Sequence, residues 1–105
     1  MEVHWKDERL RQRVLMYARS NEITARRMIS IKAARDFQDL VSPSKGRAHF
    51  LKGNLGNLFS IDLERKGNPL RLICAPQGNF QIKNGQYVKE SIQEFEVIEV
   101  KDTHK

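Results

Sequence analysis

The stretch LFSIDL-ERKGNP-LRLICA, residues 58–75, decides the fold class of this chain. In its first part Phe59, Ile61 and Leu63 alternate with polar residues, so one face of a strand is apolar and is expected to be buried. The middle part holds Lys-Gly-Asn-Pro at 66–69, which is a strong turn signal. The apolar run at 70–75 then predicts a second strand. Together the three parts predict an antiparallel hairpin.

The chain downstream of this hairpin continues the pattern of strands and turns. Residues 76–90 are predicted to form a loop with a small excursion, because Gln-Gly-Asn at 77–79 and Asn-Gly at 84–85 favour turns. Residues 95–100 are predicted to form a third strand, and their apolar side chains fall on both faces, as expected for a central position.

The chain upstream begins with a predicted strand at 2–5 and then becomes helical. Asp7 is a suitable N-cap, and Leu10, Val14 and Tyr17 follow at the spacing of one helix face. Ser20-Asn21 is predicted to end this helix.

A second helix is predicted to start at Asn21 or Thr24 and to stop before Ser42-Pro43, because proline disfavours helical geometry in the preceding residue. Its expected apolar face consists of Ala25, Ile29, Ala33, Phe37 and Leu40. Its other faces carry the cations Arg26, Arg27, Lys32 and Arg35. The predicted fold class is therefore α+β: a short N-terminal strand, two helices and a three- to four-stranded antiparallel sheet.

The length and net charge of the chain limit the classes of function that it can have. The chain has 105 residues, which fits one domain spanning 1–105, and a net charge of +6. Residues 1–53 hold 12 Lys/Arg against 6 Asp/Glu, whereas residues 54–105 hold 7 of each. Such an uneven distribution of positive charge attracts a polyanion, most often nucleic acid. An acidic protein would be attracted by the same charge.

Other sequence features concern location and covalent chemistry. No apolar run approaches the ~18 residues of a membrane span, and no signal peptide is evident, so we expect a cytoplasmic protein without a membrane partner. The lone Cys74 rules out an internal disulfide and lies in an apolar strand, where it is expected to be a buried hydrophobe.

The three histidines suggest a chemistry for the basic chain. Metal-free RNA cleavage needs a base, an acid and cations that stabilise the phosphorane, and histidine suits both proton-transfer roles. His49 enters the hairpin region and His104 follows the last strand, so both can converge on one face of the sheet. His4 is expected to be structural. No His or Cys pair has metal-ligand spacing, so we expect neither a metal nor another cofactor.

A pattern from His49 to the C-terminus resembles the RelE/ParE superfamily of bacterial toxins, and within it the HigB, or plasmid-maintenance killer, branch. The pattern consists of a His-x-Leu-Lys-Gly stretch, a second glycine, an alternating strand, a strand arginine and a terminal Asp-x-His. In this sequence the matching positions are His49, Leu51, Lys52, Gly53, Gly56, residues 59–63, Arg71, Asp102 and His104. The chain departs from the family pattern at Thr103, where an aromatic is usual, at Leu70, where a tryptophan is common, and at the uncharged Asn54-Leu55.

The resemblance implies a function and a set of partners. It implies the toxin of a type II toxin–antitoxin system, an endoribonuclease that cuts mRNA on the ribosome without a metal and leaves a 2′,3′-cyclic phosphate. The implied catalytic residues are His49, Arg71, Asp102 and His104, and Lys52 is expected to contact phosphate together with the helix cations. The implied partners are a helix-turn-helix antitoxin and mRNA, with operator DNA bound only through the antitoxin.

Two other functions and several ordinary structural roles stay open at this stage. The chain can instead be a non-enzymatic, ParE-like gyrase inhibitor or a basic nucleic-acid-binding domain. Residue by residue, His104 can be part of a frayed tail, His49 an ordinary strand residue, and Arg71 a salt-bridge residue. The arginines of the helices can simply form a solvated face.

Overall fold

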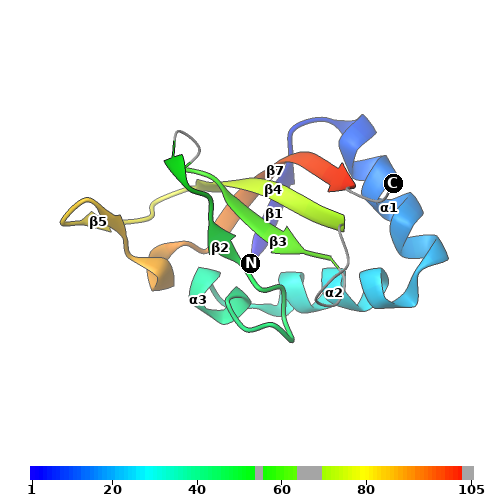
Figure 1. Ribbon diagram of the computed structural model, residues 1–105, viewed down its shortest axis with the longest axis horizontal. Helices are drawn as coiled ribbons and strands as arrows, with labels where there is room; N and C mark the ends of the chain where they lie inside the picture. Colours follow the sequence, from blue (N-terminus) through cyan, green and yellow to red (C-terminus); the bar gives the residue numbers. More distant parts are fainter. Residues whose placement is uncertain (54–55, 64–69, 103–105) are drawn as a thin grey trace.

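A twisted five-stranded sheet forms the centre of the molecule, with helices packed on one face (Figure 1). The computed structural model describes residues 1–53, 56–63 and 70–102. The strand order is β1-β7-β4-β3-β2. The strands are β1 (Glu2–Trp5), β2 (His49–Phe50), β3 (Phe59–Asp62), β4 (Leu70–Gln77) and β7 (Glu94–Asp102).

The predicted α+β class is confirmed, and the sheet is mixed rather than purely antiparallel. Strands β2, β3, β4 and β7 pair antiparallel, which agrees with the three to four antiparallel strands expected in the second half of the chain. Strand β1 adds to the other edge parallel to β7. A parallel pair requires a long crossover connection, and the helices and the remaining strands supply it here.

The hairpin predicted from residues 58–75 is present as the β3–β4 pair. Phe59 pairs with Cys74, and Asp62 pairs with Arg71 at the other end of the ladder. As the alternation predicts, Phe59, Ile61 and Leu63 are fully buried. The predicted turn at 66–69 lies outside the described residues.

Both ends of the first helix follow the predicted capping. Helix α1 (Glu8–Ser20) is capped by Asp7, whose Oδ1 accepts from the Leu10 N–H at 2.8 Å. Asn21 ends α1 and caps α2 (Glu22–Ala33), accepting from the N–H groups of Ile23 and Thr24. One asparagine therefore fixes the corner between the two helices.

The single second helix predicted to reach Ser42 is wrong in its length and in its buried face. Helix α2 ends at Ala33, and a separate short helix α3 (Phe37–Leu40) begins after the cap Asp36. Ile29 is 70% exposed. The prediction assumes one continuous helix, in which Phe37 and Leu40 share a face with residues of α2. The helix is interrupted at 34–36, so the spacing of three to four residues does not continue from α2 into α3. The buried residues of α2 are Thr24, Arg27, Met28 and Ile31.

An aromatic stack connects the core to a small ribbon that projects from the sheet. The ribbon, β5 (Ile82–Lys83) and β6 (Gln86–Tyr87), turns at Asn84-Gly85, where both residues have positive φ as a type I′ hairpin requires. Tyr87 stacks on Phe50 with centroids 4.7 Å apart, and Phe50 stacks on Phe37 of α3. A 3-10 helix, η2 (Lys89–Ser91), then leads into β7.

None of the helices among the described residues is both long and apolar enough to cross a membrane.

Candidate functional site

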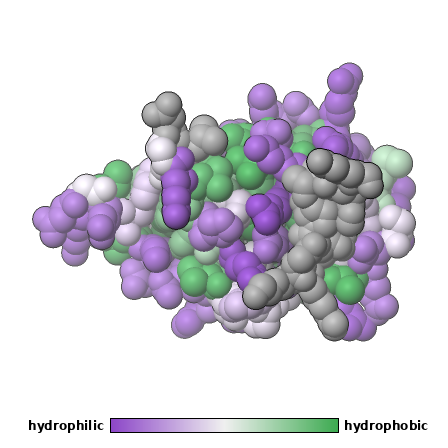
Figure 2. Space-filling model, in the orientation of Figure 1, coloured by the Kyte–Doolittle hydropathy of each residue, from purple (hydrophilic) through white to green (hydrophobic). Residues whose placement is uncertain are grey.

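The face of the sheet opposite the helices carries polar side chains where β2, β3 and β4 meet. His49 lies opposite Ser60, and Asp62 lies opposite Arg71. Ser60 and Asp62 alternate with the core residues of β3, so all four side chains share one face. We call these four residues the polar face. Figure 2 shows hydrophilic side chains over the centre of this side of the molecule and at the tip of the β5–β6 ribbon.

The two ring nitrogens of His49 have one partner in common. Nδ1 lies 3.1 Å from the carbonyl oxygen of Arg47 and 3.5 Å from Oγ of Ser60, and Nε2 lies 3.2 Å from the same Oγ. In the tautomer in which Nδ1 donates to that carbonyl, which can only accept, Nε2 is the acceptor for the nearer Ser60 hydroxyl. The side chain is exposed, whereas Ser60 is buried. The accepting nitrogen is thus a base that a solvent-borne hydroxyl can reach by displacing Ser60.

Asp62 links the polar face to two arginines. Its carboxylate lies 3.4 Å from Nε of Arg71 and 3.5 Å from Nε of Arg47. Asp62 is buried, while the side chain of Arg71 is 49% exposed. The carboxylate therefore anchors the inner side of the Arg71 guanidinium, and its outer side faces solvent, where it can contact an anion.

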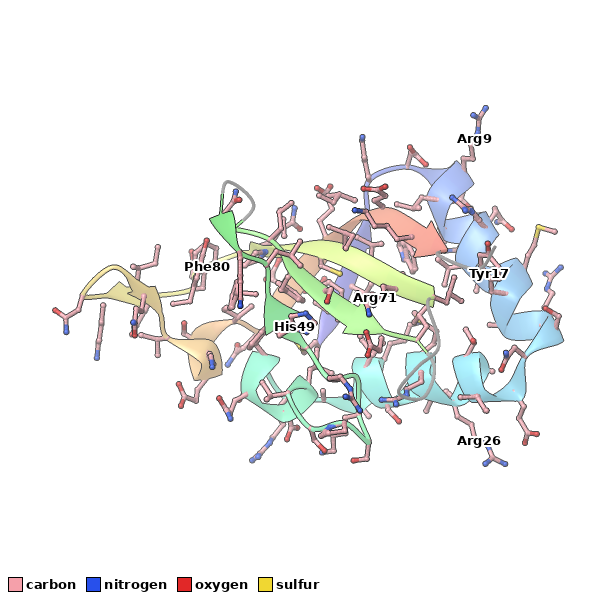
Figure 3. The ribbon with its side chains drawn as sticks, viewed as in Figure 1. Arg9, Tyr17, Arg26, His49, Arg71 and Phe80 are labelled. Atoms are coloured by element: carbon pink, nitrogen blue, oxygen red, sulfur yellow. The ribbon has the colours of Figure 1, made fainter. Side chains whose placement is uncertain are left out.

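The structure brings together part of the predicted catalytic set. His49 and Arg71 lie on the same face of the sheet, and Figure 3 labels both over its central strands. Asp102 is the last residue of β7 and its backbone pairs with Leu70, the neighbour of Arg71. His104 lies outside the described residues, as do Thr103 and Asn54-Leu55.

The predicted phosphate-binding cations do not form one surface. Lys52 is exposed beyond the end of β2. Arg26 is exposed and pairs with Glu22 at 2.6 Å, and Arg35 pairs with Asp39 beyond the end of α2. Lys32 is exposed in the last turn of α2. The prediction that Arg27 lies on an outer face of the helix is wrong, because it belongs to the buried face and is only 8% exposed.

Burial lowers the pKa of the Arg27 guanidinium from its usual value, because desolvation disfavours the charged form. The positive charge of Arg47 acts in the same direction, whereas the negative charge of Asp62 opposes it. These effects place Arg27 in the same electrostatic cluster as the Asp62 ion pairs.

Sequence reasoning missed three residues that shape the site: Arg47, Ser60 and Asp62. The only sequence signal for the two strand residues was that each is a polar position on the face of β3 opposite its apolar one, which does not distinguish them from ordinary solvent-facing residues. Arg47 carried no such signal, because it precedes β2 in an irregular segment.

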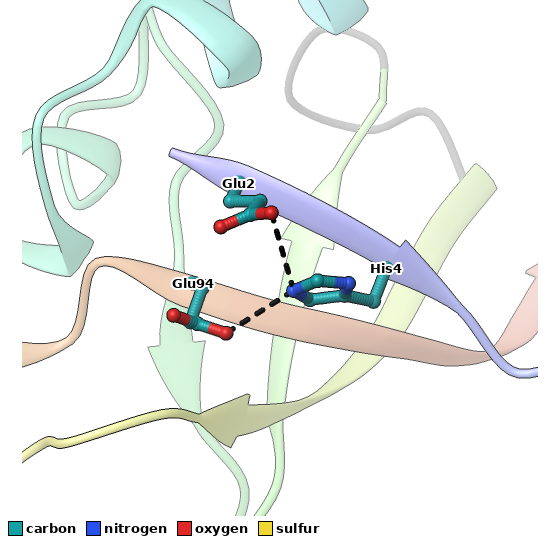
Figure 4. A group of neighbouring side chains, drawn as sticks. All are labelled: Glu2, His4 and Glu94. Atoms are coloured by element: carbon teal, nitrogen blue, oxygen red, sulfur yellow. Dashed lines mark hydrogen bonds and ion pairs between the residues drawn. The ribbon is translucent and has the colours of Figure 1, made fainter.

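A second group of ionisable side chains lies at the other edge of the sheet, where β1 meets β7 (Figure 4). Nε2 of His4 lies 3.1 Å from Glu94 and 3.9 Å from Glu2. Among the described residues these three have donor atoms close enough, all within 4.8 Å, to share one metal ion. A hydrogen bond between His4 and Glu94 accounts for the same geometry and ties β1 to β7.

Burial raises the pKa of the Cys74 thiol well above its usual value. Its side chain is fully buried in β4. A thiolate nucleophile or metal ligand at this position would be strongly disfavoured, which agrees with the expected role as a small hydrophobe.

Comparison with known proteins identifies the fold. No family model matches the chain, and no curated protein matches it. Among solved structures, a YoeB/ParE toxin from Agrobacterium tumefaciens is similar with a TM-score of 0.53 and 15% identity, covering 99% of this chain and 100% of that one. The chain therefore has the fold of that toxin along almost its whole length.

Proposed function

We propose that this protein is the toxin of a type II toxin–antitoxin system and acts as a metal-independent endoribonuclease on mRNA. The observation that carries the proposal is the placement of His49 and Arg71 on one face of the sheet, with Nε2 of His49 within hydrogen-bond distance, 3.2 Å, of the Ser60 hydroxyl. The shared fold with the YoeB/ParE toxin supports the toxin assignment. The resemblance of residues 49–104 to the HigB branch supports the choice of RNA as substrate.

The proposed reaction is transphosphorylation within the RNA. Nε2 of His49 takes the proton of a 2′-hydroxyl, and the resulting oxygen forms a bond to the neighbouring phosphorus. Arg71 stabilises the additional negative charge on the phosphorane. The bond from phosphorus to the 5′-oxygen breaks, and that oxygen takes a proton from a general acid, for which His104 is our candidate. The products are a 2′,3′-cyclic phosphate and a 5′-hydroxyl, and DNA is not cut because it lacks the 2′-hydroxyl.

The other assigned roles follow from position and charge. Asp102, beside the Arg71 strand, is proposed to orient His104. Lys52, Arg26, Lys32 and Arg35, which are exposed, are proposed to contact phosphates of mRNA or of the ribosome. The proposed regulator is a helix-turn-helix antitoxin, and the proposed location is the cytoplasm, where the ribosomes are.

The test is to induce the protein and map the 5′ ends of cellular mRNA. We expect new 5′-hydroxyl ends for the wild type and about 10²–10⁴ times less cleavage for His49→Ala, the usual contribution of acid–base catalysis. Arg71→Ala and His104→Ala are expected to lose cleavage as well. His4→Ala is the matched control, because it removes a histidine from the opposite edge of the sheet.

Growth arrest without new mRNA ends would contradict the nuclease and favour a gyrase inhibitor, which inhibition of purified gyrase would then reveal. Full cleavage by a folded His49→Ala protein would contradict the assigned base.

A further inference from the structure

A cavity of about 450 Å³ opens between α2 and the turn at residues 43–47. Three arginines line it, Arg26, Arg27 and Arg47, together with Ser30 and Ser44. None of the described residues that line it is an aspartate or a glutamate. Arg26 is paired with Glu22 and Arg47 shares Asp62 with Arg71, so the cations around the cavity outnumber their carboxylates. Guanidiniums only donate hydrogen bonds, so the wall is rich in donors.

Arg47 lines this cavity and pairs with Asp62, and its backbone has an uncommon conformation. Its φ of 48° is in the left-handed region, which is uncommon for residues other than glycine. The N–H groups of Lys45, Gly46 and Arg47 all donate to the carbonyl of Ser42, at 3.0–3.1 Å, and this turn holds the conformation in place. Such strained residues persist where the surrounding structure enforces them, often at ligand sites.

Arg47 also connects the cavity to the polar face. It shares the carboxylate of Asp62 with Arg71, at 3.5 and 3.4 Å respectively. Arg27, at the base of the same cluster, is buried and is coupled electrostatically to both Asp62 and Arg47. A row of cations therefore runs from Arg71 through Arg47 into the cavity.

We propose that this cavity binds a phosphate group of the RNA strand that is cleaved at the polar face, an inference that rests on the proposed function. A strand bound at Arg71 carries a phosphate on every nucleotide, so a neighbouring phosphate meets the next cations in the row. Paired guanidinium donors and serine hydroxyls match the several acceptor oxygens of phosphate. The continuity with Arg71 favours RNA over the acidic side chain of a protein partner.

The experiment measures binding of a fluorescein-labelled single-stranded RNA by anisotropy, with His49→Ala as the parent protein so that the RNA is not cut. Arg47→Asn is the test variant, because asparagine tolerates positive φ, so the turn is kept while the guanidinium and its ion pair with Asp62 are lost. Arg9→Asn is the matched control, since Arg9 is exposed on α1, well away from Arg26 in Figure 3.

We expect Arg47→Asn to weaken RNA binding about tenfold, the loss typical of one charge-assisted contact. The slope of log affinity against log salt is expected to flatten by about 0.7, the value for one phosphate on a single strand. Arg9→Asn is expected to change neither quantity. Circular dichroism and melting of each variant check that the fold is kept, and Ser44→Ala, with a smaller loss, supports the assignment independently of Arg47.

Three outcomes would overturn the proposal. If inorganic phosphate raises the melting temperature of the parent but not of Arg47→Asn, while RNA affinity is unchanged, the cavity takes free phosphate. If RNA affinity is unchanged and antitoxin binding is lost, the cavity takes an acidic protein segment. If Arg9→Asn weakens RNA binding as much as Arg47→Asn, the effect is only net charge. The wild-type cleavage assay is separate, so failure of this inference is distinguishable from failure of the proposed nuclease.

Discussion

Replacing Asp62 by asparagine removes the one carboxylate that the structure shows between Arg47 and Arg71 while keeping the shape of the side chain. We expect this change to destabilise the fold, because the partially buried guanidiniums would lose their counter-charge. Arg27 would lose the same favourable electrostatic interaction. The effect tests whether the cluster behind the polar face holds this part of the sheet together.

The magnitude lies between two limits. Removing one partner of a fully buried ion pair costs about 3–5 kcal/mol, whereas an exposed pair contributes about 0–1 kcal/mol. Asp62 is buried, but the side chains of Arg71 and Arg47 are 49% and 33% exposed, so solvent screens both pairs. We therefore expect a loss of about 2 kcal/mol, which corresponds to about 8–15 °C in melting temperature for a domain of this size.

The assay is thermal melting and urea unfolding of Asp62→Asn at neutral pH. The matched control is Glu22→Gln, which removes the carboxylate of the exposed ion pair with Arg26 and is expected to cost less than about 0.5 kcal/mol. A melting temperature for Asp62→Asn equal to or above that of Glu22→Gln would refute the reasoning, because the cluster would then contribute no more than a surface pair.

Two further predictions concern stability. Asn21→Ala should cost about 1 kcal/mol in urea unfolding, since the Asn21 side chain caps α2 with two hydrogen bonds, and no change would contradict the capping role. Because burial raises the pKa of Cys74 in the folded state, its contribution to stability is complete below the unfolded thiol pKa of about 8.5 and is lost as pH rises above it. Cys74→Ala should therefore show a shallower fall in stability between about pH 8.5 and 10, and identical slopes would contradict this.

Local patterns were sufficient for much of the fold. The hairpin, the first helix with its Asp7 cap and the Asn84-Gly85 turn each depend on residues close in sequence, and each is present. The parallel pairing of β1 with β7 joins segments about ninety residues apart. No local periodicity carries that information, because it depends on how the whole sheet closes.

The error in the buried face of α2 also arises from contacts between residues distant in sequence. It matters more for function because it concerns a residue near the candidate site. Residues Ala25, Ile29 and Ala33 form an apolar series in sequence, yet the buried series is the one that contains Arg27. An arginine is not expected at a buried position, because charged side chains are almost never fully buried unless they are paired. Its burial is supported by the carboxylate of Asp62, which comes from a strand more than thirty residues later.

The sequence was sufficient to predict the site residues whose side chains carry out the chemistry. It was not sufficient to predict the residues that hold those side chains in place. His49 and Arg71 could be chosen from the sequence because proton transfer and phosphate binding require those side chains. Asp62 could not, since a single aspartate in an alternating strand looks like any solvent-facing position. Its significance arises only when the strand pairing sets it opposite Arg71 and the turn at 42–47 brings Arg47 to its other oxygen. Asp62 thus interacts electrostatically with both the exposed Arg71 of the polar face and the buried Arg27 of α2. Replacing one of these arginines should therefore change the electrostatic environment of the other.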